Sequence, residues 1–203
     1  MNRRTVSLGL VLAIAAGGAL AAASVGQPAP AFTAVDTSGK AVSLADYRGK
    51  TVVLEWVNPG CPYVRKHYES ANMQATQKGA TGNGVVWLAV NSTHSGASDY
   101  KKPIDMAAWM QQHQASATHT LMDSDGKVGK AYGARTTPHL YVIDAKGTLV
   151  YAGGIDDKPS ANPADVKTAK NYVNAALADV AAGKPVAQAV TRPYGCSVKY
   201  SDG

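Results

Sequence analysis

The chain has 203 residues, a formal net charge of +6 and 17% charged residues. This length suits a single domain with a sizeable core. The charge is mildly basic and dispersed, without a basic run interleaved with aromatic residues, which argues against nucleic-acid binding. The sequence holds 2 cysteines, too few for a disulfide-stapled mini-protein or a cysteine-based zinc site. We therefore expect neither a metal nor a cofactor.

Residues 1–23 are typical of a secretory signal. Arg3 and Arg4 form a positive amino-terminal region, an apolar stretch follows, and small residues offer cleavage sites. The apolar stretch is too short to span a bilayer, so we expect no stable membrane insertion after cleavage, with a retained anchor as the alternative. The simplest destination is the bacterial periplasm, where disulfides persist. The export route, Sec or twin-arginine, stays open.

The first elements after this segment are predicted to be a hairpin and a central strand. Residues 31–36 alternate and lead into the turn signal of 36–40, which predicts a hairpin with 42–44. Residues 52–57 are an apolar, β-branched run that is typical of a buried strand. The turn residues Asn58-Pro59-Gly60 must end this strand.

Cys61 follows that turn and precedes Pro62, a residue favoured at the first position of a helix. Residues 63–78 contain no Gly or Pro and are predicted to be helical. Cys61 should therefore lie where a core strand turns into a helix. Unpaired backbone N–H groups and the positive end of the helix dipole there favour the reactive thiolate. A buried structural thiol is the alternative.

The rest of the chain alternates between strands and helices. We expect strands over 85–91, 118–122, 138–143 and 148–152, and helices over 104–114, 127–132 and 163–180. This alternation implies an α/β fold whose central sheet is covered by helices on both faces. We divide the chain into a signal (1–23), one domain (24–185) and a tail (186–203) that carries Cys196.

An ordered set of short motifs resembles the thioredoxin-like superfamily. The closest resemblance is to its redoxin branch, of the alkyl hydroperoxide reductase/thiol-specific antioxidant type, and to periplasmic thioredoxin-like proteins. The motifs in chain order are Phe32 to Asp36, Gly49-Lys50, Cys61-Pro62, Asp125-Gly126, Tyr132-Gly133, Thr137-Pro138, Ile143-Asp144 and Gly154-Ile155-Asp156. The resemblance spans roughly residues 26–182 and implies a thioredoxin-like fold with a mixed central sheet.

The resemblance also implies a site. Cys61 would be the attacking cysteine, and Thr137-Pro138 a cis-proline turn packed against it. The backbone beside this proline would position a substrate peptide in the manner of an added strand. Implied partners are protein or small-molecule thiols and disulfides, together with an electron-donor thiol system.

Two departures from the family pattern matter. Val64 stands where thioredoxins carry a second cysteine, which excludes a local redox pair. Asn58 and Leu54 replace the Thr/Ser and Pro of peroxiredoxins, and Pro138 falls where those enzymes carry an activating arginine. Two cysteines in a secreted protein usually pair, so we expect Cys61 to pair with Cys196. That pairing could be catalytic or purely structural.

These residues favour an exported thiol–disulfide oxidoreductase in which Cys61 attacks and Cys196 resolves the adduct. The alternative enzyme is a thiol peroxidase, in which Cys61 passes through sulfenic acid. The non-enzyme alternative is a redox-inert binding module with a structural disulfide. Both enzyme hypotheses predict an exposed, reducible Cys61, whereas the inert module predicts a buried sulfur.

Overall fold

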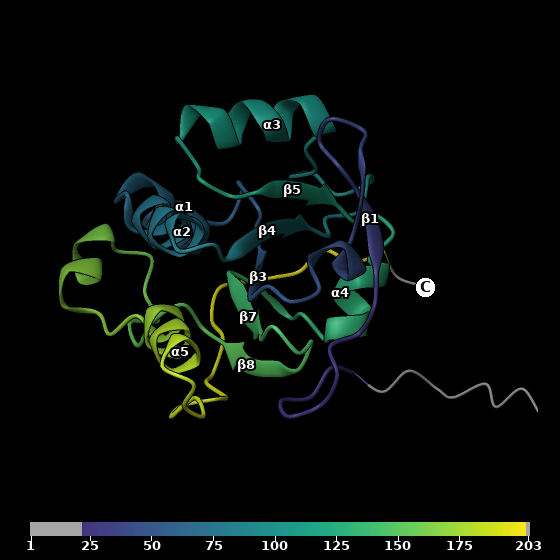
Figure 1. Ribbon diagram of the computed structural model, residues 1–203. Helices are drawn as coiled ribbons and strands as arrows, with labels where there is room; N and C mark the ends of the chain where they lie inside the picture. The colour runs from purple at the N-terminus through teal and green to yellow at the C-terminus, as the bar shows by residue number, and fades with distance from the viewer. Residues whose placement is uncertain (1–21, 202–203) are drawn as a thin grey trace, which may run out of the picture.

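The computed structural model describes residues 22–201, and most of the predicted signal lies outside this range. Seven strands form one mixed sheet in the order β2-β1-β5-β4-β3-β7-β8 (Figure 1). These strands are β1 (Thr33–Asp36), β2 (Ala41–Ser43), β3 (Val52–Trp56), β4 (Val86–Asn91), β5 (His119–Met122), β7 (His139–Ile143) and β8 (Leu149–Gly153). The helices are α1 (Pro62–Glu69), α2 (Asn72–Gly82), α3 (Pro103–Gln112), α4 (Lys127–Tyr132) and α5 (Tyr172–Ala181), with 3-10 segments η1 (Leu44–Tyr47) and η2 (Pro163–Thr168).

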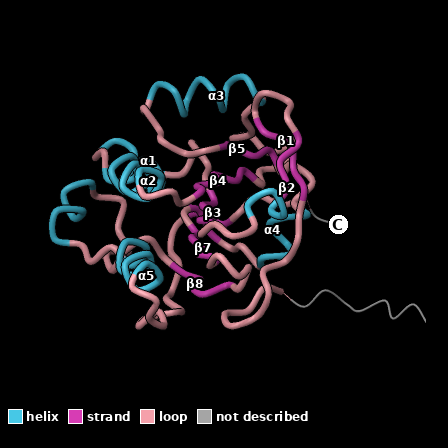
Figure 2. Tube along the Cα trace, in the orientation of Figure 1, coloured by secondary structure: helices cyan, strands magenta, loops and turns pink. Residues whose placement is uncertain are grey.

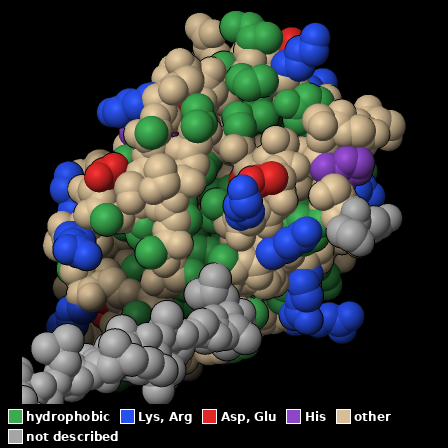
Figure 3. All heavy atoms as spheres, turned by 90° about the vertical axis from the view of Figure 1, so that its right-hand side faces the viewer, with side chains coloured by type: hydrophobic (Ala, Val, Ile, Leu, Met, Phe, Trp, Pro, Cys, Tyr) green, Lys and Arg blue, Asp and Glu red, His purple; other side chains and the backbone are tan. Residues whose placement is uncertain are grey.

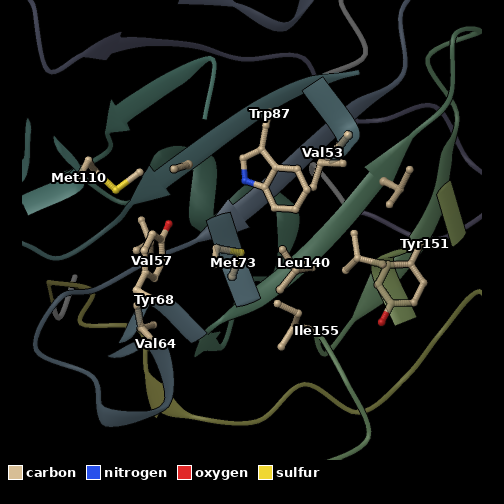
Figure 4. Close-up of a cluster of buried hydrophobic side chains, with 14 of the residues drawn as sticks. Val53, Val57, Val64, Tyr68, Met73, Trp87, Met110, Leu140, Tyr151 and Ile155 are labelled. Carbon is tan, nitrogen blue, oxygen red and sulfur yellow. The ribbon is translucent and has the colours of Figure 1, made fainter. Parts of the chain in front are cut away.

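The central strand β3 pairs in parallel with β4 and antiparallel with β7. Its side chains alternate between two cores. Val53 belongs to a buried cluster, shown in Figure 4, that also contains side chains of α1, α2, α3 and α5. Leu54 and Trp56 pack on the opposite face, with Tyr132 of α4. This burial on both faces explains the continuous apolar run, and it confirms the predicted α/β architecture with helices on both faces.

The predicted helix over 63–78 is wrong in one respect, because two helices occupy this stretch. α1 ends at Glu69, and Ala71 adopts a left-handed conformation with φ 60° before α2 begins. The backbone oxygen of Tyr68, in the last turn of α1, accepts from the Ala71 amide at 3.3 Å and from the Gln74 side chain at 2.7 Å. The packing of α1 and α2 as separate helices thus overrides a local sequence that is compatible with one continuous helix.

The helix predicted over 163–180 also differs from the helix in the structure. Pro163 opens the 3-10 segment η2, and the long helix α5 begins only at Tyr172. Asn171 caps α5 by accepting from the Asn174 amide at 2.9 Å, and its own amide donates to Thr76 at 3.0 Å. This second contact ties the start of α5 to α2, which a local sequence pattern could not reveal.

The tail after α5 runs across the domain, from the α5 side to the α4 side (Figures 1 and 2). Near its end, β9 (Cys196–Ser197) pairs antiparallel with β6 (Thr136–Thr137) to form a separate two-stranded sheet. Lys and Arg side chains are distributed over the face that Figure 3 shows, among hydrophobic and neutral ones. Within residues 22–201, no helix is both long and apolar enough to cross a membrane.

Leu140 on β7 provides a test of this packing. Its side chain is fully buried in the helix-covered core, so Leu140→Ala should lower the free energy of unfolding by about 2–5 kcal/mol through lost contacts and a cavity. Ile104 of α3 is 72% exposed, so Ile104→Ala should change stability by no more than about 0.5 kcal/mol. Urea denaturation of both variants measures the difference, and similar losses would contradict the arrangement.

Candidate active site

Cys61 lies where the sequence predicts, between β3 and α1. It is the N-cap residue of α1, with extended backbone angles, and Pro62 is the first helical residue. The turn before it is held by Asn58, whose side-chain oxygen accepts from the Gly60 amide at 2.7 Å. The Asn58 amide group donates to Thr93 at 3.1 Å and to Asp99 at 2.8 Å. The polar atoms of Asn58 are therefore used to brace the loop.

The Thr137-Pro138 peptide bond is cis, as the sequence predicts. The turn lies directly against Cys61, because the Thr137 carbonyl oxygen is 3.0 Å from the Cys61 sulfur. Thr137 also belongs to β6, so its backbone is at once part of the cysteine environment and part of a strand edge. An edge of this kind can pair with an extended peptide.

Cys196 occupies that strand edge. Its backbone is paired with Thr137, and its sulfur lies 2.6 Å from the sulfur of Cys61. Both thiols are free in this structure. The preceding Gly195 has φ 128°, and a Cβ atom there would overlap the Thr137 oxygen. The predicted pair is thus brought together across 135 residues of sequence by a backbone approach that only glycine permits.

One expectation about Cys61 is wrong for this structure. Both enzyme hypotheses predict an exposed Cys61, whereas Cys61 is only 1% exposed, as the redox-inert alternative predicts. The tail covers it, because Cys196 and Tyr194 pack against the core cluster that contains Cys61. Burial, together with the contact to Cys61, raises the pKa of the Cys196 thiol to about 12. A thiol held in its protonated form is a poor first nucleophile, which leaves Cys61 as the better candidate for attack.

Beneath this site, Glu55 sits in the middle of β3 and is fully buried. Its carboxylate accepts hydrogen bonds from Tyr68 at 2.9 Å, from Gln77 at 2.9 Å and from Trp87 at 2.7 Å. Burial raises its pKa to about 7, although these donors oppose the shift. The only sequence signal for this network is a single acidic residue inside an apolar run.

A second polar cluster was missed by sequence reasoning. It combines Lys66 and His67 of α1 with Asp156 after β8 and Tyr194 of the tail. The Lys66 ammonium group donates to the Lys158 carbonyl at 2.7 Å and faces Asp156. No sequence signal distinguishes this lysine from a solvated helix residue. In the part of the chain that the structure describes, no three His, Cys, Asp or Glu side chains are grouped to hold a metal ion.

The sheet order, the cysteine at the start of α1 and the cis-proline against its sulfur define a protein of the thioredoxin-like fold, as the sequence predicts. A more specific assignment comes from the family comparison. The profile of the AhpC/TSA family matches residues 25–152. The chain belongs to this family.

The chain is also similar to individual thiol–disulfide oxidoreductases and to a solved structure. The thiol-disulfide oxidoreductase ResA of Bacillus thuringiensis subsp. konkukian is 24% identical over 126 residues, covering 62% of this chain and 67% of the relative. The thiol:disulfide interchange protein DsbE of Pseudomonas aeruginosa is 26% identical over 143 residues, covering 68% and 72%. An uncharacterized conserved protein of Geobacillus kaustophilus superposes with a TM-score of 0.78 at 25% identity, covering 89% of this chain and 94% of that one. The family and the named relatives support the predicted oxidoreductase.

Replacing Glu55 by glutamine should change the pH dependence of stability. The folded protein holds the Glu55 proton more tightly than the unfolded chain, because burial raises the pKa from 4.5 to about 7. The favourable contribution of the protonated group is complete below about pH 4.5 and is lost as the pH rises to about 7. The free energy of unfolding of the wild type minus that of Glu55→Gln should therefore fall by about 3 kcal/mol over this interval.

Denaturation series between pH 4 and 8 measure this difference. Glu69→Gln is the matched control, because Glu69 lies exposed on α1. The control should show no comparable trend against the wild type. A flat difference for Glu55→Gln would mean that the pKa of Glu55 is the same in the folded protein as in the unfolded chain.

Proposed function

We propose that this protein is a thiol–disulfide oxidoreductase in which Cys61 attacks and Cys196 resolves. The observation that carries the proposal is the juxtaposition of the two sulfurs, 2.6 Å apart, beside the cis Thr137-Pro138 bond. Membership of the AhpC/TSA family and the similarity to proteins named ResA and DsbE support it. Because Val64 occupies the next turn of α1, the resolving thiol has to come from another segment, and Cys196 meets this need.

The proposed reaction moves two electrons in two exchange steps. The Cys61 thiolate attacks one sulfur of a substrate disulfide, forming a mixed disulfide and releasing the other substrate sulfur as a thiolate. Cys196 then attacks the Cys61 sulfur, the Cys61–Cys196 disulfide forms, and the second substrate thiolate leaves. Protons lost by the two protein thiols are taken up by the substrate thiolates. An external dithiol reduces the protein disulfide and is itself oxidised.

The site suits substrates that present a disulfide or thiol within an extended peptide. β6 already pairs with a strand of the protein's own tail, with Thr137 opposite Cys196. Backbone pairing of this kind supplies affinity with little regard to sequence. We therefore propose protein thiols and disulfides as substrates, with small-molecule thiols as electron donors or competitors. Export to the periplasm through residues 1–23 remains part of the proposal.

Replacing each cysteine by serine tests the roles. Cys196→Ser should accumulate a mixed disulfide at Cys61 when offered oxidised glutathione or a disulfide peptide, because no second thiol resolves it. Cys61→Ser should accumulate much less adduct, because burial keeps the Cys196 thiol protonated. Intact mass spectrometry separates the species. Loss of stability in Cys196→Ser without any adduct would instead favour a structural disulfide in a redox-inert module.

Peroxide reduction separates the proposal from a peroxidase. Fast peroxidases need fixed donors that stabilise charge on the peroxide oxygens. The donor hydrogens of Asn58 are bound to Thr93 and Asp99, and Pro138 offers no donor. The rate of Cys61 oxidation by hydrogen peroxide should therefore match that of an ordinary thiol of similar acidity. Stopped-flow rates close to those of a dedicated peroxiredoxin would contradict the proposed oxidoreductase and favour a thiol peroxidase.

A further inference from the structure

The second polar cluster, made of Lys66, His67, Asp156 and Tyr194, lies outside the two-cysteine chemistry described so far. The Tyr194 hydroxyl donates to Oδ1 of Asp156 at 2.5 Å and lies 3.0 Å from Nε2 of His67. It is also 3.5 Å from Nζ of Lys66, which faces the Tyr194 ring at 5.4 Å. One tail hydroxyl thus contacts all three titratable side chains that the domain contributes.

The hydrogen bonds of the cluster run in one direction. Asn72 is placed to donate to Nδ1 of His67 at 2.8 Å, which leaves the proton of the neutral ring on Nε2. Burial lowers the pKa of His67 to about 3, so the ring is neutral near pH 7. Nε2 then donates to the Tyr194 oxygen, and the Tyr194 hydroxyl donates to Asp156. Tyr194 therefore connects His67 to Asp156 in this series of hydrogen bonds.

The cluster is buried deeply enough to depend on this connection. The side chains of Lys66 and Asp156 are 0% and 1% exposed, and Nζ lies 3.7 Å from Oδ2. Within residues 22–201, Oδ2 of Asp156 makes no hydrogen bond, and Oδ1 accepts only from Tyr194 and from the Lys158 amide. A buried carboxylate is costly unless it is hydrogen-bonded. When the tail is in place, Tyr194 therefore supplies a hydrogen bond that the buried Asp156 carboxylate would otherwise lack.

The position of Tyr194 links this cluster to the cysteines. Tyr194 is two residues before Cys196, with Gly195 between them. Lys66 and His67 belong to α1, the helix that Cys61 caps. A single short helix therefore carries both the attacking thiol and the seat for the tail. Fixing Tyr194 on this helix fixes Cys196 relative to Cys61.

We propose that Tyr194 is a positioning residue for the two-cysteine chemistry, acting as a latch that holds the tail on the Thr136–Thr137 edge. The inference rests on the proposed function. With the latch seated, Cys196 is held against Cys61, and the tail excludes external peptides from the edge. With the latch released, Cys61 becomes accessible to a substrate. The burial of Cys61 is thus a property of the latched state.

The latch predicts two changes of opposite direction in Tyr194→Phe. The alkylation rate of Cys61 in the reduced protein should rise, because the tail is unseated more often once a hydrogen bond to a buried carboxylate is lost. The equilibrium constant for forming the Cys61–Cys196 disulfide against glutathione should fall, because the reduced protein gains the unseated state while the disulfide keeps the tail in place. Since the same hydrogen bond accounts for both effects, the two fold-changes should multiply to about ten. Peptide mapping by mass spectrometry assigns the alkylated cysteine.

Tyr172→Phe is the matched control. Tyr172 lines the same hollow of about 520 Å³ as Tyr194, and its hydroxyl makes no hydrogen bond within the described residues. Both quantities should stay at wild-type values in this control. Gly195→Ala releases the tail by an independent route, because its Cβ would overlap the Thr137 oxygen. It should move both quantities in the same directions as Tyr194→Phe, whereas Gly79→Ala, on an open part of α2, should move neither.

The outcomes separate this inference from the proposed function. If the wild type forms no Cys61–Cys196 disulfide in the glutathione titration, the proposed function fails. If the wild type forms the disulfide but Tyr194→Phe matches it in both equilibrium constant and alkylation rate, only the latch fails. A purely structural role for Tyr194 would lower the free energy of unfolding while leaving both readouts unchanged, which would also overturn the latch.

Discussion

The close approach of the tail backbone to Thr137 is the constraint on which the site depends. A side chain at residue 195 would overlap the Thr137 carbonyl oxygen, so the pairing that presents Cys196 exists only because residue 195 lacks a Cβ atom. The same device recurs along the tail, because Cβ atoms at Gly153 and Gly129 would overlap Thr191 and Tyr200. The domain surface is therefore shaped to receive its own tail at several points.

Two buried polar groupings fix the helices that surround the cysteines. Glu55 draws together Tyr68 of α1, Gln77 of α2 and Trp87 of β4. Asp156 does the same for α1 and the tail. Buried polar groups tolerate few alternative arrangements, because each lost partner leaves a desolvated group unsatisfied. These contacts can therefore specify where α1 lies more sharply than apolar packing alone.

Sequence reasoning succeeds where the signal is local. The strand, turn and proline around Cys61 predict its place at a helix start. The cis bond at Thr137-Pro138 was implied by the family resemblance, and the structure has it. With only two cysteines present, the sequence also indicates Cys196 as the residue that lies near Cys61, which the structure shows. The break at Ala71 and the burial of Cys61 depend on contacts between distant segments. The position of Tyr194 against Lys66 and His67 also depends on contacts between distant segments. In the sequence, these two residues look like ordinary residues of a solvated helix.

The chain positions of the two thiols have a consequence for biosynthesis. Cys196 follows Cys61 by 135 residues. At translation rates of about 5–20 residues per second, roughly 7 to 27 s separate the synthesis of the two cysteines. In the mechanism proposed above, the nascent chain carries the attacking thiol during that interval before its resolving partner exists. Adducts formed at Cys61 in that time would be resolved by the protein itself only after Cys196 has been made.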